Sequence, residues 1–526
     1  MSLWSLTLVI AGIAALGVYY TSSASRKRTR DVDGLPRPPR ESWLFGNLLQ
    51  LFLPRNYGDH EFGWHAEYGD VYVIHGVLGQ SRMMVADPMA LNHLLRNDDV
   101  HLAPMMLALA RSLLGRGNAM ALRGQPLRNV AESALTACTT QITKALDSED
   151  GQEGSVVNIA EPLSTATLSA ISQVILGLSV EALGAEVVEA NVSILLSGFR
   201  APCLAEAMAP YLPAPFLDWM FGLPLPMFAT IRRAYELGRK VGDQVIQELA
   251  QAEHSEDSDE RNCEHLYGKI LAQNSKKALS PDELAMQTNL VLIAGQDTTA
   301  NTLAFALAGL ARQPALQEAL RAEIRKAQSE PEIDDESLPL LNAVIKVRAH
   351  FQRSINSRSV LQETLRLLPA EPIAEKIALV DLTMPLSRPV TLSDGRVVNQ
   401  LFVPKGQLVG LAFAGYQRGE TRWGPEPEAF NPYRWIEGKV GVDAPMATSP
   451  YAHLLAFSNG PHVCLGWRFA ILEMQVILTE LIPNFVCKIP EDPALAMGFK
   501  FSNTLAPCDG KGDKRAWLLV ERVRDL

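Results

Sequence analysis

Cysteine is scarce in this chain, and its scarcity limits the classes of protein that fit. The 526 residues include six cysteines, and no two of them form a CxxC pair. This scattered set excludes a disulfide framework and fits a reducing compartment. Positive charge is also in short supply, because 48 Lys and Arg oppose 58 Asp and Glu and leave a net charge of -10. An acidic chain of this kind is not expected to bind nucleic acid.

Low-complexity linkers are absent after residue 40, so the rest of the chain is expected to form one domain. The composition, 47% hydrophobic and 20% charged, is that of a large globular protein with an ample core. We therefore divide the chain into residues 1–22, residues 23–40 and a catalytic domain over residues 41–526.

Charge is absent from the first of these segments. Leu3 to Tyr20 is an apolar run that would span about 27 Å as a helix, close to the bilayer core of about 30 Å. No basic residue precedes the run, whereas several follow it in a basic and proline-rich hinge over residues 23–40. The charge asymmetry predicts a transmembrane anchor over residues 1–22, with the rest of the chain on the cytoplasmic side.

A glycine-rich loop near the C-terminal end carries the most specific motif. Phe457, Gly460, Cys464 and Gly466 follow the pattern FxxGxxxCxG, and the apolar run from Leu465 to Leu481 predicts a helix that begins at the cysteine. A thiol at a helix N-terminus is favoured as thiolate, which is the form that binds metals. The alternative is an ordinary buried cysteine, but packing alone does not require the spaced glycines.

A second motif lies in a long apolar segment upstream. A capping box, Ser280 to Glu283, predicts a helix that runs to about Arg312. Its middle holds the polar run Ala294-Gly295-Gln296-Asp297-Thr298-Thr299. Burying such groups is costly, and a mid-helix glycine adds roughly 1 kcal/mol, so the pattern suggests a place where a small ligand approaches the backbone. The alternative is a core helix whose threonines bond back to its own carbonyls.

Together these motifs resemble the cytochrome P450 family over roughly residues 34 to 510. The resemblance implies a mainly α fold with a small β-rich portion, and haem b between the two motifs. Cys464 would be the axial thiolate of the haem iron, Thr298 would hydrogen-bond the dioxygen, and Asp297 would relay protons. The remaining cofactor contacts implied by the loop and by the long helix are Phe457, Gly460, His462, Gly466, Ala294 and Gly295.

Two further sets of residues follow from the same resemblance. Glu363, Arg366 and Arg434 would form the interlocked set that braces the haem loop; the first two also share one helix face. The haem propionates need cations, and His462, Lys376 and Arg128 are the candidates, although ordinary surface arginines are an alternative for the last.

The implied activity is insertion of one oxygen atom from O2 into an apolar small molecule, with electrons from an NADPH–cytochrome reductase. The chain looks most like fungal microsomal members, which implies a single-pass endoplasmic reticulum protein in contact with membrane lipid. A terpenoid-like substrate of secondary metabolism is the first expectation, with fatty-acid or xenobiotic hydroxylation as alternatives. Apolar segments 101–120 and 195–231 would roof the substrate pocket, or the second would dip into the membrane.

Acidic residues are missing from one stretch where the family pattern is interrupted. Residues 345–360 carry five basic side chains and no acid, and they separate Val344 from Leu361 just before Glu363. We predict that this stretch translates an unspliced intron; a natural surface loop is the alternative. If it spoils the bracing of the haem loop, the protein would be a haem-binding protein without oxygenase activity.

Overall fold

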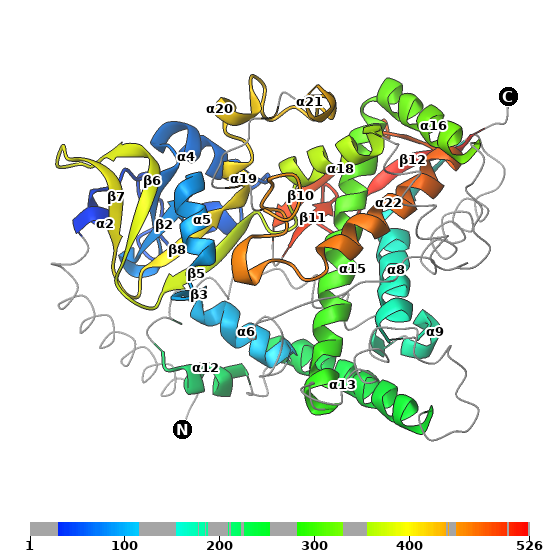
Figure 1. Cartoon of the computed structure of the whole chain (residues 1–526), viewed down its shortest axis with the longest axis horizontal. Coiled ribbons are helices and arrows are strands. Elements are labelled where there is room, and N and C mark those ends of the chain that lie inside the picture. Colours follow the sequence, from blue (N-terminus) through cyan, green and yellow to red (C-terminus); the bar gives the residue numbers. More distant parts are fainter. Residues whose placement is uncertain are drawn as a thin grey trace.

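The computed structural model describes residues 30–114, 154–176, 178–184, 186–187, 209, 212–221, 226–252, 281–329, 355–437, 440, 446, 449–501 and 504–523. Helices dominate this part of the chain, and short strands form separate sheets at its edges (Figure 1). The predicted mainly α fold with a small β-rich portion is confirmed.

The α-helices vary widely in length, and the longest, α15, crosses the helical side of the molecule (Figure 1). In chain order they are α2 (Arg30–Gly34), α3 (Leu48–Phe52), α4 (Glu61–Tyr68), α5 (Pro88–Arg96), α6 (Pro104–Leu114), α8 (Ala160–Ile171), α9 (Val180–Leu183), α12 (Ala214–Phe221), α13 (Pro226–Ala252), α15 (Pro281–Ala311), α16 (Pro314–Ser329), α18 (Ile355–Leu367), α19 (Phe413–Tyr416), α20 (Glu420–Trp423), α21 (Tyr433–Ile436) and α22 (Trp467–Asn484). Single turns η1 (Val77–Gly79), η2 (Ser172–Leu176), η6 (Gly460–His462) and η7 (Pro493–Leu495) complete the set.

The largest sheet has the strand order β1-β2-β8-β5-β3, in which β2 and β8 are parallel and the other neighbours are antiparallel. Its strands are β1 (Val71–His75), β2 (Ser81–Val85), β3 (Val100–Leu102), β5 (Ile373–Ala378) and β8 (Leu408–Ala412). Smaller sheets pair β6 (Leu382–Thr391) with β7 (Val397–Val403), β10 (Gly498–Phe501) with β11 (Leu505–Cys508), and β4 (Ser155–Asn158) and β9 (Phe485–Lys488) with β12 (Trp517–Arg522).

The two largest of four hydrophobic clusters among the described residues support this arrangement. One lies around the five-stranded sheet and includes Val32 and Leu35, so the described part of the expected hinge, from residue 30 onward, packs onto the domain. The other joins α15, α16, α18 and α22. Because α15 and α22 share this second core, the helix of the polar run packs against the helix that follows the Cys464 loop.

The helix of the polar run forms largely as the sequence predicts. It begins at Pro281, after the serine of the capping box, and ends at Ala311, because Pro314 starts the next helix. Gly295 also has a packing contact, because a Cβ there would lie 1.8 Å from Cδ1 of Ile171 on α8. Its predicted place beside a ligand stays a prediction.

The membrane prediction needs correction. Within the ranges that the structure describes, no helix is both long enough and apolar enough to cross a membrane. The longest one, α15, carries polar residues in its middle and is covered by other helices. This finding contradicts the predicted single-pass location in the endoplasmic reticulum membrane. Residues 1–22, where the sequence predicts the anchor, lie outside the described residues.

Candidate active site

The loop that carries Cys464 is fixed by its own backbone. The amide of Cys464 donates to the Phe457 carbonyl at 2.9 Å, and the Asn459 side chain accepts from the Gly460 amide at 2.8 Å. Gly460 has φ +70°, and a Cβ at this position would lie 2.6 Å from the Leu95 carbonyl oxygen. Only glycine satisfies both the positive φ and the close approach.

The helix after this loop starts later than the sequence predicts. Helix α22 begins at Trp467 with Gly466 as its N-cap, so Cys464 precedes the helix by three residues instead of opening it. The helix extends to Asn484 and includes Pro483 near its end. Even so, the backbone N–H of Gly466 acts on the sulfur as expected. Burial raises the pKa of the Cys464 thiol, and the Gly466 hydrogen bond opposes that rise.

The Cys464 residue is open to water, yet the surrounding protein desolvates its sulfur. Glu371, which the sequence analysis did not single out, has the same combination: its residue is exposed, and burial raises the pKa of its carboxyl. The negative charge of Glu371 also raises the pKa of the Cys464 thiol. Both residues therefore combine an accessible surface with a desolvated titratable group.

Helix α15 presents two adjacent faces. Ala294 and Thr298, four residues apart on one face, are accessible, and the Thr298 hydroxyl donates to the Ala294 carbonyl at 2.7 Å. This bond is the back-bonding that the core-helix alternative describes. Asp297 lies on the neighbouring face and is buried. The structure therefore separates the two predicted catalytic residues onto adjacent sides of the helix.

Asp297 has a partner that the sequence did not reveal. The Lys514 ammonium, from the loop between β11 and β12, donates to Oδ2 of Asp297. The other carboxylate oxygen, Oδ1, is buried and has no hydrogen-bond partner within the described residues. No local pattern links two residues 217 positions apart.

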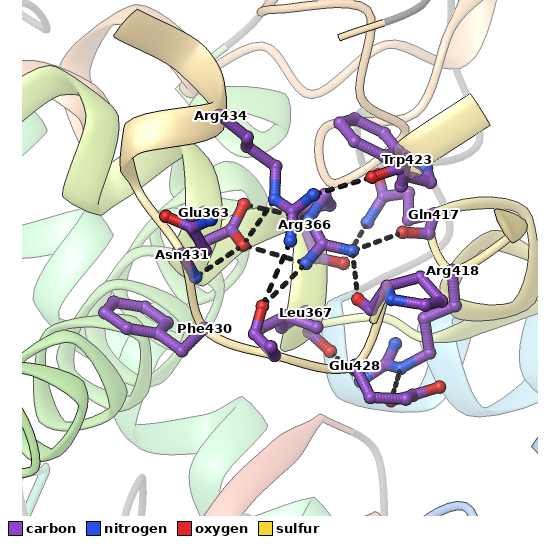
Figure 2. Close-up of polar contacts among 12 residues, drawn as sticks. Glu363, Arg366, Leu367, Gln417, Arg418, Trp423, Glu428, Phe430, Asn431 and Arg434 are labelled. Carbon is purple, nitrogen blue, oxygen red and sulfur yellow. Dashed lines mark hydrogen bonds and ion pairs between the residues drawn. The ribbon is translucent and has the colours of Figure 1, made fainter. Parts of the chain in front are cut away.

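Glu363, Arg366 and Arg434 come together as predicted (Figure 2). Arg366 donates to both oxygens of Glu363 at 2.8 and 2.9 Å, and Arg434 donates to Oε1 at 2.9 Å. The backbone N–H of Asn431 and the ring N–H of Trp435 also donate to the Glu363 carboxylate, each at 2.9 Å. Burial alone would raise the pKa of Glu363, but these donors hold it below its usual value.

The same network reaches the haem loop through Gln417. Arg366 donates to the Gln417 carbonyl at 3.0 Å (Figure 2). The Gln417 side chain accepts from the backbone amide of Leu455 at 2.7 Å. Leu455 lies two residues before Phe457, whose ring packs edge to face against Tyr451. The bracing therefore connects α18 to the loop of Cys464 through hydrogen bonds between buried groups.

Two of the three candidate propionate cations lie at one corner of the main sheet. The His462 ring meets the His101 ring at 6.1 Å between centroids, and His101 precedes Leu102, which pairs with Lys376 across β3 and β5. Burial lowers the pKa of Lys376, and the charge of Glu371 raises it. The third candidate, Arg128, lies outside the described residues.

The residues present fit a haem. Cys464 offers an accessible thiol, the kind of group that would hold a haem iron. Lys376 and His462 lie nearby and would pair with the haem carboxylates.

The segments expected to roof the pocket are described in part. Helices α6, α12 and α13 share an apolar cluster with the first half of α15. Its members are Met105, Ala108, Ala110, Ala209, Leu217, Phe228 and Ile231, together with Leu290 and Ile293 of α15. Trp219 on α12 stays half exposed. Residues 115–120 and most of residues 195–211 lie outside the described residues.

Comparison with known proteins agrees with this site. The family model described as "Cytochrome P450" matches residues 36–347 and 357–505. "Cytochrome P450 monooxygenase claU" of Ampulloclitocybe clavipes is 26% identical and covers 94% of each chain. "Cytochrome P450 monooxygenase 205" of Postia placenta is 24% identical and covers 92% of each chain. The interruption of the family match, residues 348–356, falls within the stretch that the sequence analysis singled out.

A fold of this kind, with one cysteine presented by a glycine-rich loop, defines a haem-thiolate protein. The chain belongs to the cytochrome P450 family. It is accordingly an oxidoreductase of the monooxygenase type, which uses O2, an organic substrate and a redox partner.

Proposed function

We propose that this protein holds haem b on Cys464 and hydroxylates an apolar small molecule in fungal secondary metabolism. A terpenoid-like compound is the first expectation. The observation that carries the proposal is Cys464, whose residue is accessible, whose thiol is desolvated, and whose backbone amide donates to the Phe457 carbonyl in a turn that requires Gly460. When bound, haem supplies the redox chemistry that splits O2.

The overall reaction sets what the chain's own residues must do. One oxygen atom enters the substrate and the other leaves as water, so each turnover consumes two electrons and two protons. The accessible hydroxyl of Thr298 is placed to donate a hydrogen bond toward the reacting oxygen after leaving the Ala294 carbonyl. Asp297, on the adjacent face, is the proposed proton donor.

The apolar cluster of α6, α12, α13 and α15 supports an apolar substrate, because it lies along the first half of the helix that carries Thr298. An open hollow of about 660 Å³ lies against the Cys464 loop and includes Arg96, Pro461, Val463 and Arg468 in its lining. Its two arginines suit the acidic surface of an electron donor. We propose that an NADPH–cytochrome reductase docks there.

The bracing network bears on the alternative of a haem-binding protein without oxygenase activity. That alternative requires damage to the support of the Cys464 loop. Glu363, Arg366 and Arg434 instead keep a complete set of hydrogen bonds beside the interruption of the family match. This intact network supports the active enzyme.

The test is the spectrum of the reduced protein with carbon monoxide, followed by product analysis. Wild type should show the strongly red-shifted Soret band of a thiolate-ligated haem, and Cys464→Ser should lose it. Wild type with a reductase and NADPH should then oxidise one of a panel of apolar compounds drawn from terpenoids, fatty acids and xenobiotics. Absence of this band in the wild-type protein would refute the proposal. Presence of the band in Cys464→Ser would refute it as well.

A further inference from the structure

One face of α15 is fastened to the C-terminal segment at successive turns. Asp297, Asn301 and Phe305 are spaced four residues apart and share this face. Asp297 accepts from the Lys514 ammonium, Asn301 donates to the Leu505 carbonyl at 3.1 Å, and the Phe305 ring meets Phe499 edge to face at 5.4 Å between centroids. The site therefore borders a segment that lies some 200 residues farther along the chain.

The burial of these groups matters because Asp297 is the proposed proton donor. Its side chain is 2% exposed, so bulk water does not reach it directly. Lys514 is 13% exposed and stands on a loop that turns between β11 and β12. The Lys514 side chain thus touches the carboxylate and keeps a small exposed surface.

The two carboxylate oxygens of Asp297 differ in their surroundings. Oδ2 is occupied by Lys514, while Oδ1 is buried without a hydrogen-bond partner in the described part of the chain. A buried acceptor without a partner is costly, and a group kept in that state is a candidate for transient proton binding. Thr298 is the next residue on the helix, so a proton on Asp297 lies beside the open face.

We propose that Lys514 is a positioning residue that holds the Asp297 carboxylate at the edge of the site and links it to solvent. This inference rests on the proposed function. Each proton reaches Asp297 from solvent alongside Lys514, whose ammonium keeps its charge, and Asp297 delivers the proton inward and returns to carboxylate. The pair therefore ends each transfer with its original charge, one proton having crossed from solvent to the site.

The experiment compares Lys514→Met, Lys514→Arg and Arg515→Met in the full-length holoenzyme. Arg515 is the matched control, because it lies on the same loop but faces Asp509 and Asp513 instead of α15. Product, hydrogen peroxide and NADPH consumption are measured together in H2O and D2O. Reduced carbon monoxide spectra and thermal unfolding midpoints are recorded for each variant.

Lys514→Met should keep the thiolate band but lower the product formed per NADPH by about tenfold, with more peroxide and a larger solvent isotope effect. Lys514→Arg should restore most of the coupling, because the guanidinium keeps the positive charge. Arg515→Met should behave as wild type. Lys514→Met should also lower the unfolding midpoint less in an Asp297→Asn background, because the two residues interact directly.

Several results would overturn the inference. Wild-type coupling and isotope effect in Lys514→Met would show that protons reach the site without this pair. An equal loss of product per NADPH in Arg515→Met would show that the effect belongs to the loop as a whole. Loss of the thiolate band in Lys514→Met would show that Lys514 is needed for the folded haem site and not for proton supply. Absence of the band in wild type would instead refute the proposed function, and this inference with it.

Discussion

The negative charge of Glu363 is expected to contribute several kcal/mol to the free energy of unfolding of this protein. Five hydrogen bonds converge on its carboxylate, from Arg366, Arg434, Asn431 and Trp435. Glu363→Gln keeps the shape of the side chain but removes the anion. It therefore leaves the buried guanidinium groups of Arg366 and Arg434 without a counter-charge. Breaking a buried ion pair from one side typically costs about 3 to 5 kcal/mol.

The chain offers a matched control for this cost. Glu428 meets Arg418 at 2.9 Å, the same distance as Glu363 to Arg434, but Glu428 is 58% exposed whereas Glu363 is fully buried. Exposed pairs typically contribute about 0 to 1 kcal/mol. Glu428→Gln should therefore change the free energy of unfolding much less than Glu363→Gln, although both remove one carboxylate charge.

Urea unfolding of the holoprotein, followed through the Soret band, gives the difference between the two variants. Because the folded pKa of Glu363 is lowered, its contribution is present above the ordinary glutamate pKa of about 4.3 and is lost as pH falls through the folded value. The difference in free energy of unfolding between wild type and Glu363→Gln should thus become smaller in acid. A difference below about 1 kcal/mol at pH 7, or one that does not become smaller in acid, would refute the reasoning.

Three further predictions concern single side chains. Thr298→Ala should keep the thiolate band but release reducing equivalents as hydrogen peroxide; wild-type product per NADPH would contradict the role of this face of α15. Gly460→Ala should destabilise the protein by about 1 to 3 kcal/mol in thermal or urea unfolding, since its methyl would meet the Leu95 carbonyl. Gly63→Ala is the control and should not destabilise the protein in this way, because a Cβ there meets no atom within 4 Å. Glu473→Gln should be tolerated within about 1 kcal/mol in the same assays, because burial raises the pKa of Glu473 and so disfavours the charged form that the amide would replace.

Local patterns in the sequence were enough to predict α15, because a capping box and a proline bound the helix. The i, i+3 spacing places Glu363 and Arg366 on one face, but such a spacing is common on helices, and only the family resemblance singled the pair out. Arg434 was joined to them by the same resemblance, because its contact closes a loop of 71 residues. The start of α22 was misplaced because the apolar run continues through Leu465, which precedes the helix and is more than half exposed.

Contacts between distant segments account for the rest of what the sequence did not reveal. Three residues that belong to no motif make such contacts. Lys514 contacts Asp297, and Gln417 connects Arg366 to Leu455. Glu371 raises the pKa of the Cys464 thiol. Gly295 has a second physical role that the motif does not disclose, since its missing Cβ leaves room for the Ile171 side chain of α8. A motif can therefore locate a residue without disclosing what touches it.

The stretch over residues 345–360 can be judged against the helix it adjoins. Its last six residues form the start of α18, and Ser359 and Val360 are buried there. Removing the whole stretch would join Val344 to Leu361, so that valine again precedes Leu361 and Ala343 replaces Ser359. The helix would thus keep an apolar residue at its buried position, which is why the splicing hypothesis is compatible with an intact Glu363 network. Sequencing the mature transcript decides between the two forms, and messages that consistently encode residues 345–360 would establish a natural insertion.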